Sequence, residues 1–230
     1  MGTAQQAPVL TIDGPSGSGK GTVSQLLAAR LGWHYLDSGA LYRVIGLAGV
    51  EKGLPLDDAA NLAILARTID IRFEPQGHGS PARVWLDGRE VSDVLRTEET
   101  GRLASQVAIL APVRAALLEK QRDFCRFPGL VADWRDMGTT VFPYALLKVF
   151  LTASPEVRAQ RRHKQLKEKG FDVNLPRLLG EIRERDTRDA ERAASPLKPA
   201  ADAEILDTSD MNIEEVVNVV FERLGQRLSR

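Results

Sequence analysis

The sequence has one cysteine, few aromatic residues and no excess of charge of either sign, and each of these shortages excludes a class of protein. Cys125 has no second cysteine with which to form an internal disulfide. It also has no local His or Asn motif, so we interpret it as a buried or bystander thiol. The 31 basic residues balance 31 acidic ones, which argues against a nonspecific nucleic-acid binder, because such proteins are usually basic.

Long hydrophobic runs are also missing. No apolar stretch is long enough to span a membrane, and residues 1–7 lack the basic region and apolar run of a signal peptide. We therefore expect a reduced, cytoplasmic protein that binds neither membrane nor nucleic acid. The 230 residues have an ordinary apolar content of 43%, which allows one large domain or a core with an insertion.

A glycine-rich stretch at residues 12–22 stands between two regular patterns. The apolar run 8–12 precedes it, and an amphipathic helix pattern follows at residues 23–31. A strand, a glycine-rich turn and a helix, in this order, are the context of a phosphate-binding loop. The alternative interpretation is a chance glycine turn that caps a helix.

The composition of this stretch suits phosphate chemistry. Gly14, Gly17 and Gly19 allow the backbone N–H groups to approach a phosphate, and the helix that follows directs its partial positive end to the same place. Lys20 adds a full charge for the outer phosphates. The general pattern places Ser or Thr directly after the lysine, whereas here Gly21 precedes Thr22; this ending is typical of nucleoside monophosphate kinases.

The rest of the chain alternates between short apolar runs and helical patterns. Five runs predict strands of a parallel sheet, with ligands at their carboxyl ends: residues 8–12, 33–36, 129–133, 148–152 and 203–206. The helices between them are expected at about residues 23–31, 38–52, 59–67, 98–110, 113–126, 174–192 and 212–228, and one more helix is expected to begin at the capping residues 154–156.

A small antiparallel unit interrupts this alternation. Residues 68–74 and 83–86 alternate as strands around a turn at 76–81, and Asp87-Gly88 is a strong hairpin signal into residues 89–91. We expect this unit to be an insertion on the parallel core.

Polar residues cluster just beyond three predicted elements. Ser38 can cap a helix, and Arg43 in its second turn favours a nearby anion or is a plain surface residue. Asp133 ends a buried strand, where a carboxylate can hold Mg²⁺ through water, and Arg135 and Asp136 bind ligand or form a surface ion pair.

The third cluster is the charged segment 181–192. Arg185, Arg188 and Arg192 share one helical face, which is unfavourable unless an anion lies against them. The alternative is a solvated helix with pairs such as Glu181 with Arg185 and Arg185 with Asp189. A second basic group, Arg161 and Arg162, is interpreted as part of a phosphate-covering lid or as an ordinary exposed helix.

From about residue 9 to its end, the chain resembles the bacterial cytidylate kinases, P-loop kinases that phosphorylate CMP and dCMP. The motifs that carry the resemblance are Thr-Ile-Asp-Gly-Pro-Ser-Gly-Ser-Gly-Lys-Gly-Thr, Leu-Asp-Ser-Gly-Ala-Leu-Tyr-Arg, Ala-Ser-Gln-Val-Ala, Arg-Asp-Met-Gly-Thr and Glu-Arg-Asp-Thr-Arg-Asp. The resemblance implies an α/β, P-loop nucleoside monophosphate kinase fold: a five-stranded parallel sheet with helices on both faces, an inserted monophosphate-binding domain that contains the antiparallel β unit, and a short lid. The implied domains are a core at 1–37, 105–157 and 174–230, a monophosphate-binding domain at 38–104, and a lid at 158–173.

The resemblance also implies ATP and Mg²⁺ as cofactors, CMP and dCMP as substrates, and a monomer. ATP would be held by Gly14, Pro15, Ser16, Gly17, Ser18, Gly19, Lys20, Gly21 and Thr22, and the metal by Thr22 and, through water, Asp133. The catalytic residues would be Lys20, Arg135, Arg161, Arg162 and Arg188. The monophosphate would contact Ser38, Arg43, Ser105, Arg114, Arg135, Asp136, Arg185, Asp189 and Arg192.

Two positions depart from the expected family pattern, which has Gly where this chain has Trp134 and Asp where it has Tyr144. Because a tryptophan is strained at positive φ, we expect a negative φ at Trp134 and an indole that points away from the substrate or lies at the rim of the site. Another monophosphate kinase, acting on UMP or AMP, or a weakly active nucleotide-binding relic is the alternative function.

Overall fold

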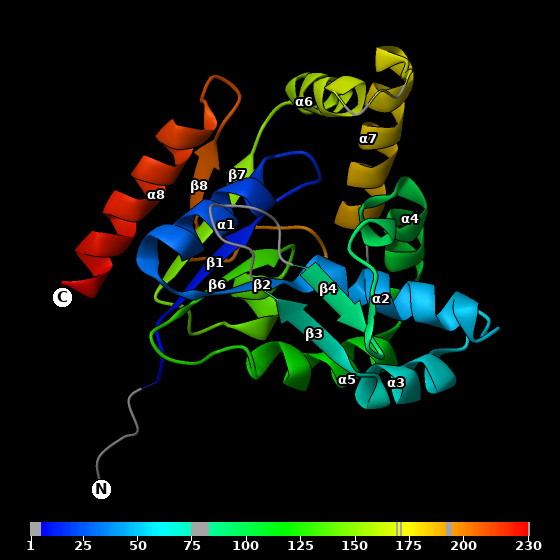
Figure 1. The fold of residues 1–230 in the computed structure, drawn as a ribbon. Coiled ribbons are helices and arrows are strands. Elements are labelled where there is room, and N and C mark those ends of the chain that lie inside the picture. The colour runs from blue at the N-terminus through cyan, green and yellow to red at the C-terminus, as the bar shows by residue number, and fades with distance from the viewer. Residues whose placement is uncertain (1–5, 75–82, 169, 171, 192–194, 230) are drawn as a thin grey trace, which may run out of the picture. The chain divides into compact units, whose positions relative to one another are not determined.

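The computed structural model describes residues 6–74, 83–168, 170, 172–191 and 195–229. The chain forms two compact units, drawn together in Figure 1. One unit comprises residues 1–7 and 28–130, and the other comprises residues 8–27 and 131–230.

A five-stranded sheet has the strand order β2-β6-β1-β7-β8. Its central strand, β1 (Val9–Asp13), runs parallel to β7 (Leu147–Thr152), which in turn runs parallel to β8 (Glu204–Asp207). The other two strands are β6 (Leu130–Trp134) and β2 (His34–Asp37). Every residue of β1 and of β6 is buried, as expected for parallel strands that are covered on both faces. The predicted α/β fold with a five-stranded parallel core is therefore confirmed.

Helices with side-chain caps flank this sheet. In the second unit, α6 (Pro155–Glu168), α7 (Leu175–Ala190) and α8 (Ile213–Leu228) follow one another along the chain. Asn174 caps α7, and Asn212 forms a capping box with Glu215 at the start of α8. These caps satisfy backbone N–H groups that the first helical turn leaves unpaired, and both helix starts agree with the prediction.

The first unit is mainly helical. The longest of its helices, α2 (Ser38–Glu51), packs against α4 (Glu98–Val107), and α3 (Ala59–Thr68) packs against α5 (Ala111–Arg122). The core between them contains fully buried large side chains, including Tyr42, Ile45, Leu62 and Leu117. A short 3₁₀ turn, Val94–Arg96, precedes α4, and α1 (Lys20–Leu31) passes from one unit into the other.

The predicted antiparallel insertion is present. The three strands β3 (Ile71–Glu74), β4 (Arg83–Leu86) and β5 (Arg89–Glu90) form a sheet in this order. Asp87 and Gly88 both have positive φ, 47° and 80°, the backbone that a tight two-residue hairpin requires. The turn predicted at 76–81 lies outside the described residues.

The structure corrects several boundaries. Strand β3 begins at Ile71 because α3 continues to Thr68, and α5 ends at Arg122, before the predicted residue 126. The strand predicted to be buried at 33–36 has only Leu36 fully buried. In the described part of the chain, no single helix has the length and apolarity to cross a membrane; the pair 99–107 and 111–122, bent by 103°, meets that criterion on length and composition only.

Candidate active site

The glycine-rich stretch forms the predicted loop between β1 and α1. Gly14, Gly17 and Gly19 have φ of 149°, 79° and 86°, where side chains other than glycine are strained. A Cβ on Gly14 would lie 2.1 Å from the carbonyl oxygen of Leu151. This position therefore excludes every side chain, and the loop has the strand-turn-helix context expected from the sequence.

The loop carries several polar groups that suit an anion. The Lys20 Nζ donates to the carbonyl of Pro15 at 2.9 Å, which keeps the ammonium group folded back over the loop. The Ser18 Oγ is buried and has no hydrogen-bond partner among the residues that the structure describes. Because Lys20 begins α1, the N–H end of this helix faces the same loop. The geometry is that of an anion cradle.

Asp13, at the end of β1, is a site residue that the sequence analysis missed. Its carboxylate accepts hydrogen bonds from the backbone N–H groups of Met137, at 2.9 Å, and Gly138, at 2.8 Å. Burial raises the pKa of Asp13 to about 7; the nearby Asp136 also raises it, while the two N–H donors and Lys20 lower it. The available signal was its position, because Asp13, like Asp133, ends an apolar strand that leads into the ligand edge of the sheet.

Asp133 and Asp136 lie around the end of β6 and are both buried, with exposed fractions of 3% and 1%. Because β6 and β1 are neighbours in the sheet, the ends that carry Asp133 and Asp13 lie at the same edge. After Asp136 the chain forms a single π-helical turn, Met137–Val141. The described residues contain no group of three or more His, Cys, Asp or Glu side chains that could hold a metal by themselves. One or two carboxylates such as Asp133 suit Mg²⁺, because this ion keeps several waters and binds mainly to substrate phosphates.

Arg135 is buried and paired, which contradicts the alternative of a surface ion pair with Asp136. Its Nε donates to Asp189 Oδ2 on α7 at 2.6 Å, and the two side chains are 2% and 1% exposed. Its guanidinium carbon lies 4.1 Å from the centre of the Trp134 ring. Trp134 is not among the non-glycine residues with positive φ, as predicted. The residue is only 7% exposed, and the expectation that its indole points away from the substrate or lies at the rim of the site stays a prediction.

Arg158, on α6, is a second residue that the sequence analysis missed. Its side chain is 3% exposed and forms an ion pair with Asp186 of α7. It also donates through Nη1 to the carbonyl of Ser16, at 3.0 Å, and through Nε to the carbonyl of Ala153, at 2.9 Å. One side chain thus joins the phosphate loop, the end of β7 and α7. Sequence reasoning singled out Arg161 and Arg162 in this helix, and periodicity offered no signal to distinguish Arg158 from them.

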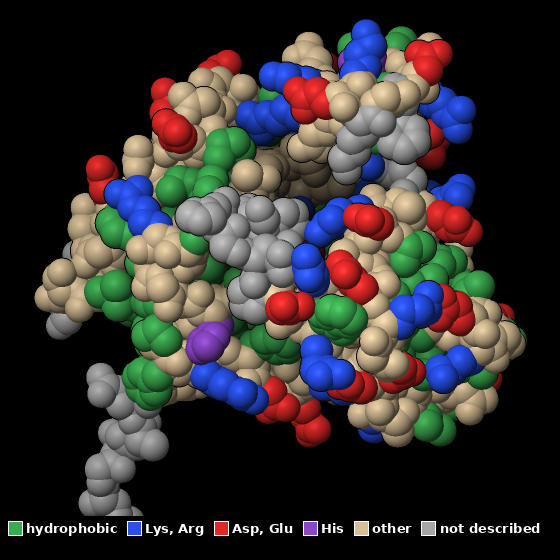
Figure 2. All heavy atoms as spheres, viewed as in Figure 1, with side chains coloured by type: hydrophobic (Ala, Val, Ile, Leu, Met, Phe, Trp, Pro, Cys, Tyr) green, Lys and Arg blue, Asp and Glu red, His purple; other side chains and the backbone are tan. Residues whose placement is uncertain are grey.

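The remaining arginines of α6 and α7 have different surroundings. Arg161 donates to the side chain and carbonyl of Thr208, Arg162 and Arg185 are half-buried, and Arg188 is exposed. Arg192 lies outside the described residues. Figure 2 shows basic side chains interspersed with acidic ones over these two helices. Their predicted contacts with phosphate stay predictions.

In the first unit, Ser38 and Arg43 lie on α2. The Asp37 carboxylate, not the Ser38 hydroxyl, caps this helix by accepting from Ala40 N–H. The Ser38 Oγ is buried and accepts from Gln121 Nε2 at 2.6 Å. Arg43 donates through Nη1 to the carbonyl of Leu95, at 2.8 Å, whereas its buried Nε has no partner in the described part of the chain. Arg43 is therefore a partly buried cation whose Nε can still donate a hydrogen bond.

The other two candidates of this unit flank the junction between α4 and α5. Ser105 bonds back to the carbonyl of Gly101 in its own helix, at 3.1 Å. Arg114 donates to the carbonyl of Ala108, at 3.2 Å, and lies over the Tyr42 ring, 5.7 Å from its centre. The structure thus places Ser38, Arg43, Ser105 and Arg114 in one compact unit and the phosphate loop with Arg135, Asp136, Arg185 and Asp189 in the other.

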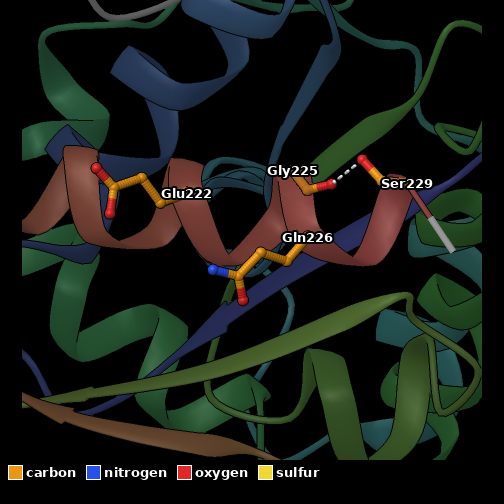
Figure 3. Close-up of a pocket in the computed structure, with 4 residues that line it drawn as sticks. All are labelled: Glu222, Gly225, Gln226 and Ser229. Atoms are coloured by element: carbon orange, nitrogen blue, oxygen red, sulfur yellow. Dashed lines mark hydrogen bonds between the residues drawn. The ribbon is translucent and has the colours of Figure 1, made fainter.

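A hollow on the surface of α8 has a different character. Figure 3 shows its lining residues Glu222, Gly225, Gln226 and Ser229, with the Ser229 hydroxyl bonded to the Gly225 carbonyl at 2.9 Å. Three of these residues lie on α8 and Ser229 is its C-cap, and the four include neither a cation nor a glycine-rich loop. This hollow therefore has no feature of the phosphate-binding site.

The glycine loop, its lysine and the buried carboxylates at the strand ends define a P-loop phosphotransferase. The family model described as cytidylate kinase matches residues 10–226, and the chain belongs to this family. It is 53% identical over 226 residues to a cytidylate kinase from Shewanella frigidimarina (strain NCIMB 400), covering 98% of this chain and 99% of that one. It is 55% identical over 224 residues to a cytidylate kinase from Aeromonas salmonicida (strain A449), covering 97% and 96%.

Among solved structures, a gluconokinase from Sinorhizobium meliloti 1021 aligns over 96% of this chain and 94% of its own, with 19% identity and a TM-score of 0.48. That likeness is too remote to bear on function.

Proposed function

We propose that this protein transfers the γ-phosphoryl group of ATP to CMP and dCMP, giving CDP and dCDP. The observation that carries the proposal is its membership of the cytidylate kinase family over nearly the whole chain. The phosphate loop supports it, because the three glycines and Lys20 have the backbone and the charge that an ATP site needs. The alternatives are a kinase for another monophosphate and a binding module without catalysis.

The proposed division of labour follows the chemistry of the two substrates. The loop from Gly14 to Thr22 holds the ATP phosphates. Arg135 and Arg43 bind the phosphate of CMP, because a planar guanidinium matches two phosphate oxygens. Cytosine offers an amine donor and two acceptors, so it is read by Ser105, Arg114, Asp136 and Arg192. Asp189 and Arg185 face the ribose, while Arg161, Arg162 and Arg188 neutralise the transferring group.

The reaction needs no general base on the protein. The CMP phosphate is already ionised at neutral pH, so the protein's contribution is alignment and neutralisation of charge. The exposed Thr22 hydroxyl in the first turn of α1 and, through water, Asp133 would hold Mg²⁺. When bound, this ion would supply positive charge that offsets the charge of the ATP phosphates. Lys20 follows the charge that develops on the bridging oxygen.

We further propose that residues 38–104 form the monophosphate-binding domain and residues 158–173 the lid, with the remainder as core. This division is by role, and it differs from the two compact units, which reflect packing. A lid that closes over ATP would exclude water and suppress wasteful hydrolysis. The proposal includes a cytoplasmic monomer that acts on small molecules.

The test is an assay that couples ADP release to a panel of acceptors, CMP, dCMP, UMP, AMP, GMP and dTMP, with ATP and Mg²⁺. We expect CMP and dCMP to have the highest kcat/KM, and EDTA to abolish turnover. A different preferred acceptor would establish another monophosphate kinase. Binding of ATP and CMP without ADP release would establish a binding module.

A further inference from the structure

The side chains of Trp134 and Arg135 stack although the two residues are neighbours in the chain. Successive side chains of a strand point to opposite faces, so adjacent residues normally do not meet. Here β6 ends at Trp134, the chain turns, and the Arg135 guanidinium carbon comes to 4.1 Å from the centre of the indole ring. The stack therefore depends on the strand ending at this residue.

A second contact fixes the orientation of Arg135. Its Nε donates to Asp189 Oδ2 at 2.6 Å, and both side chains are almost completely buried. The Nη atoms of Arg135 make no hydrogen bond to any residue that the structure describes. The indole covers one face of the guanidinium, and the Nε donates to Asp189. The two Nη atoms are therefore the donors that can bind an acceptor on a ligand. That arrangement suits two oxygens of one phosphate.

A buried guanidinium needs both contacts. Taking an arginine out of water is unfavourable unless the charge is compensated, and Asp189 supplies one compensating group. A tryptophan face, the best of the aromatic rings for a cation, supplies another. A glycine at position 134 has no aromatic ring to stack on the guanidinium. The Arg135 side chain would then be free to adopt more rotamers.

We propose that Trp134 is a positioning residue for the monophosphate substrate, acting through Arg135. The inference rests on the proposed function, which gives Arg135 the phosphate of CMP or dCMP as its ligand. Trp134 does not touch the substrate in this proposal; its ring holds the guanidinium in the orientation that binds phosphate.

The test compares Trp134→Phe, which keeps an aromatic face, with Trp134→Leu, which fills the space without one. We expect Trp134→Leu to lower kcat/KM for CMP about tenfold and to change KM for ATP less than about twofold, and Trp134→Phe to stay within about threefold of wild type. Trp33→Leu, in the proposed core, where the indole lies beside Gly129, is the matched control and should leave both constants within about twofold. Thermal unfolding of each variant identifies any that is not folded.

A double-mutant cycle makes the test specific. In an Arg135→Met background, Trp134→Leu should have no further effect on kcat/KM for CMP, because Trp134 acts only through the missing guanidinium. Equal losses in the Phe and Leu variants, or a Leu effect that persists without Arg135, would overturn the inference.

The same variants separate this inference from the proposed function. CMP affinity is measured by calorimetric titration without ATP. A wild-type protein that binds CMP but never phosphorylates it would refute the proposed function, and the binding series would still decide the role of Trp134. A wild-type protein that does not bind CMP would refute both.

Discussion

Arg158 on α6 and Asp186 on α7 form a two-pronged ion pair, in which Nη1 donates to Oδ1 at 3.0 Å and Nη2 donates to Oδ2. The same Nη1 donates to the Ser16 carbonyl in the phosphate loop. The Arg158 side chain is 3% exposed and that of Asp186 27%. The loop that we propose to hold ATP is thus tied through one guanidinium to the helix that carries Arg185, Arg188 and Asp189.

The first prediction concerns this pair. Arg158→Lys cannot make both bonds to Asp186 and reach Ser16, because an ammonium group is a point donor. We expect the free energy of unfolding to fall by about 2–4 kcal/mol, as when a mostly buried pair is broken, and KM for ATP to rise. Urea denaturation and steady-state kinetics measure the two effects.

The control is the exposed pair between Arg177 and Glu181, whose side chains are 80% and 51% exposed. Arg177→Ala should cost less than about 1 kcal/mol. Equal stability losses at Arg158 and Arg177 would show that the buried bridge has no special importance.

The second prediction concerns pH and Asp13. Its carboxyl has a pKa of about 7 in the folded protein and 3.8 as its ordinary value. Between about pH 4 and 7 the folded state holds a proton that the unfolded state has lost, so this group makes stability fall as pH rises through that range. Below the range both states are protonated, and above it both are ionised.

Asp13→Asn, which resembles the protonated side chain, should remove this slope. We expect the variant to gain stability relative to wild type as pH rises from about 4 to 7, measured by denaturation at a series of pH values. Asp58→Asn is the contrasting control, because the Asn61 side chain lowers the pKa of the Asp58 carboxyl, which gives a slope of opposite sign at lower pH. Parallel profiles for wild type and Asp13→Asn would contradict the prediction.

The third prediction concerns Lys20, whose ammonium now bonds to the Pro15 carbonyl. We expect Lys20→Ala to lower kcat by orders of magnitude and to weaken CMP binding far less, because the charge is needed most in the transition state. Coupled kinetics and CMP titration measure the two effects, with exposed Lys52→Ala as the control. Turnover within about tenfold of wild type would remove Lys20 from the mechanism.

The fourth prediction concerns base choice. If the buried Asp136 accepts from the cytosine amine, uracil would present a carbonyl to it and leave the carboxylate unpaired. We expect Asp136→Ala to lower kcat/KM for CMP and to narrow the preference of CMP over UMP, by about 2–3 kcal/mol. Exposed Asp123→Ala should leave that preference unchanged. An unaltered preference in the Asp136 variant would place base recognition elsewhere.

Local patterns predicted most of the elements. The phosphate loop followed from glycine spacing between an apolar run and an amphipathic helix, and the Asp87-Gly88 hairpin from the φ values that only a few residue types adopt. Helix starts at Asn174 and Asn212 followed from the capping chemistry of asparagine. Element ends were less accurate: α3 continues to Thr68 and α5 stops at Arg122, because packing decides where a helix ends when no strong stop signal is present.

The partners of buried charges were not accessible to such reasoning. Helical spacing placed Asp189 at i,i+4 from Arg185, but it gave no reason to expect the hydrogen bond between the Asp189 carboxylate and Arg135, 54 residues away. Asp13 ended a strand like Asp133, but only the fold brought the N–H groups of Met137 and Gly138 to it. Long-range pairs of this kind leave no trace in local spacing.

The sequence by itself determined the class of fold, the phosphate loop and the family resemblance, because each depends on residues close together in the chain. Only the tertiary structure decided which charges are buried and what compensates them. Arg158 pairs with Asp186, Arg135 lies between Trp134 and Asp189, and the Asp13 carboxylate accepts two backbone N–H hydrogen bonds. The physical reason is that desolvation depends on every atom packed around a group, and those atoms come from strands and helices far apart in sequence.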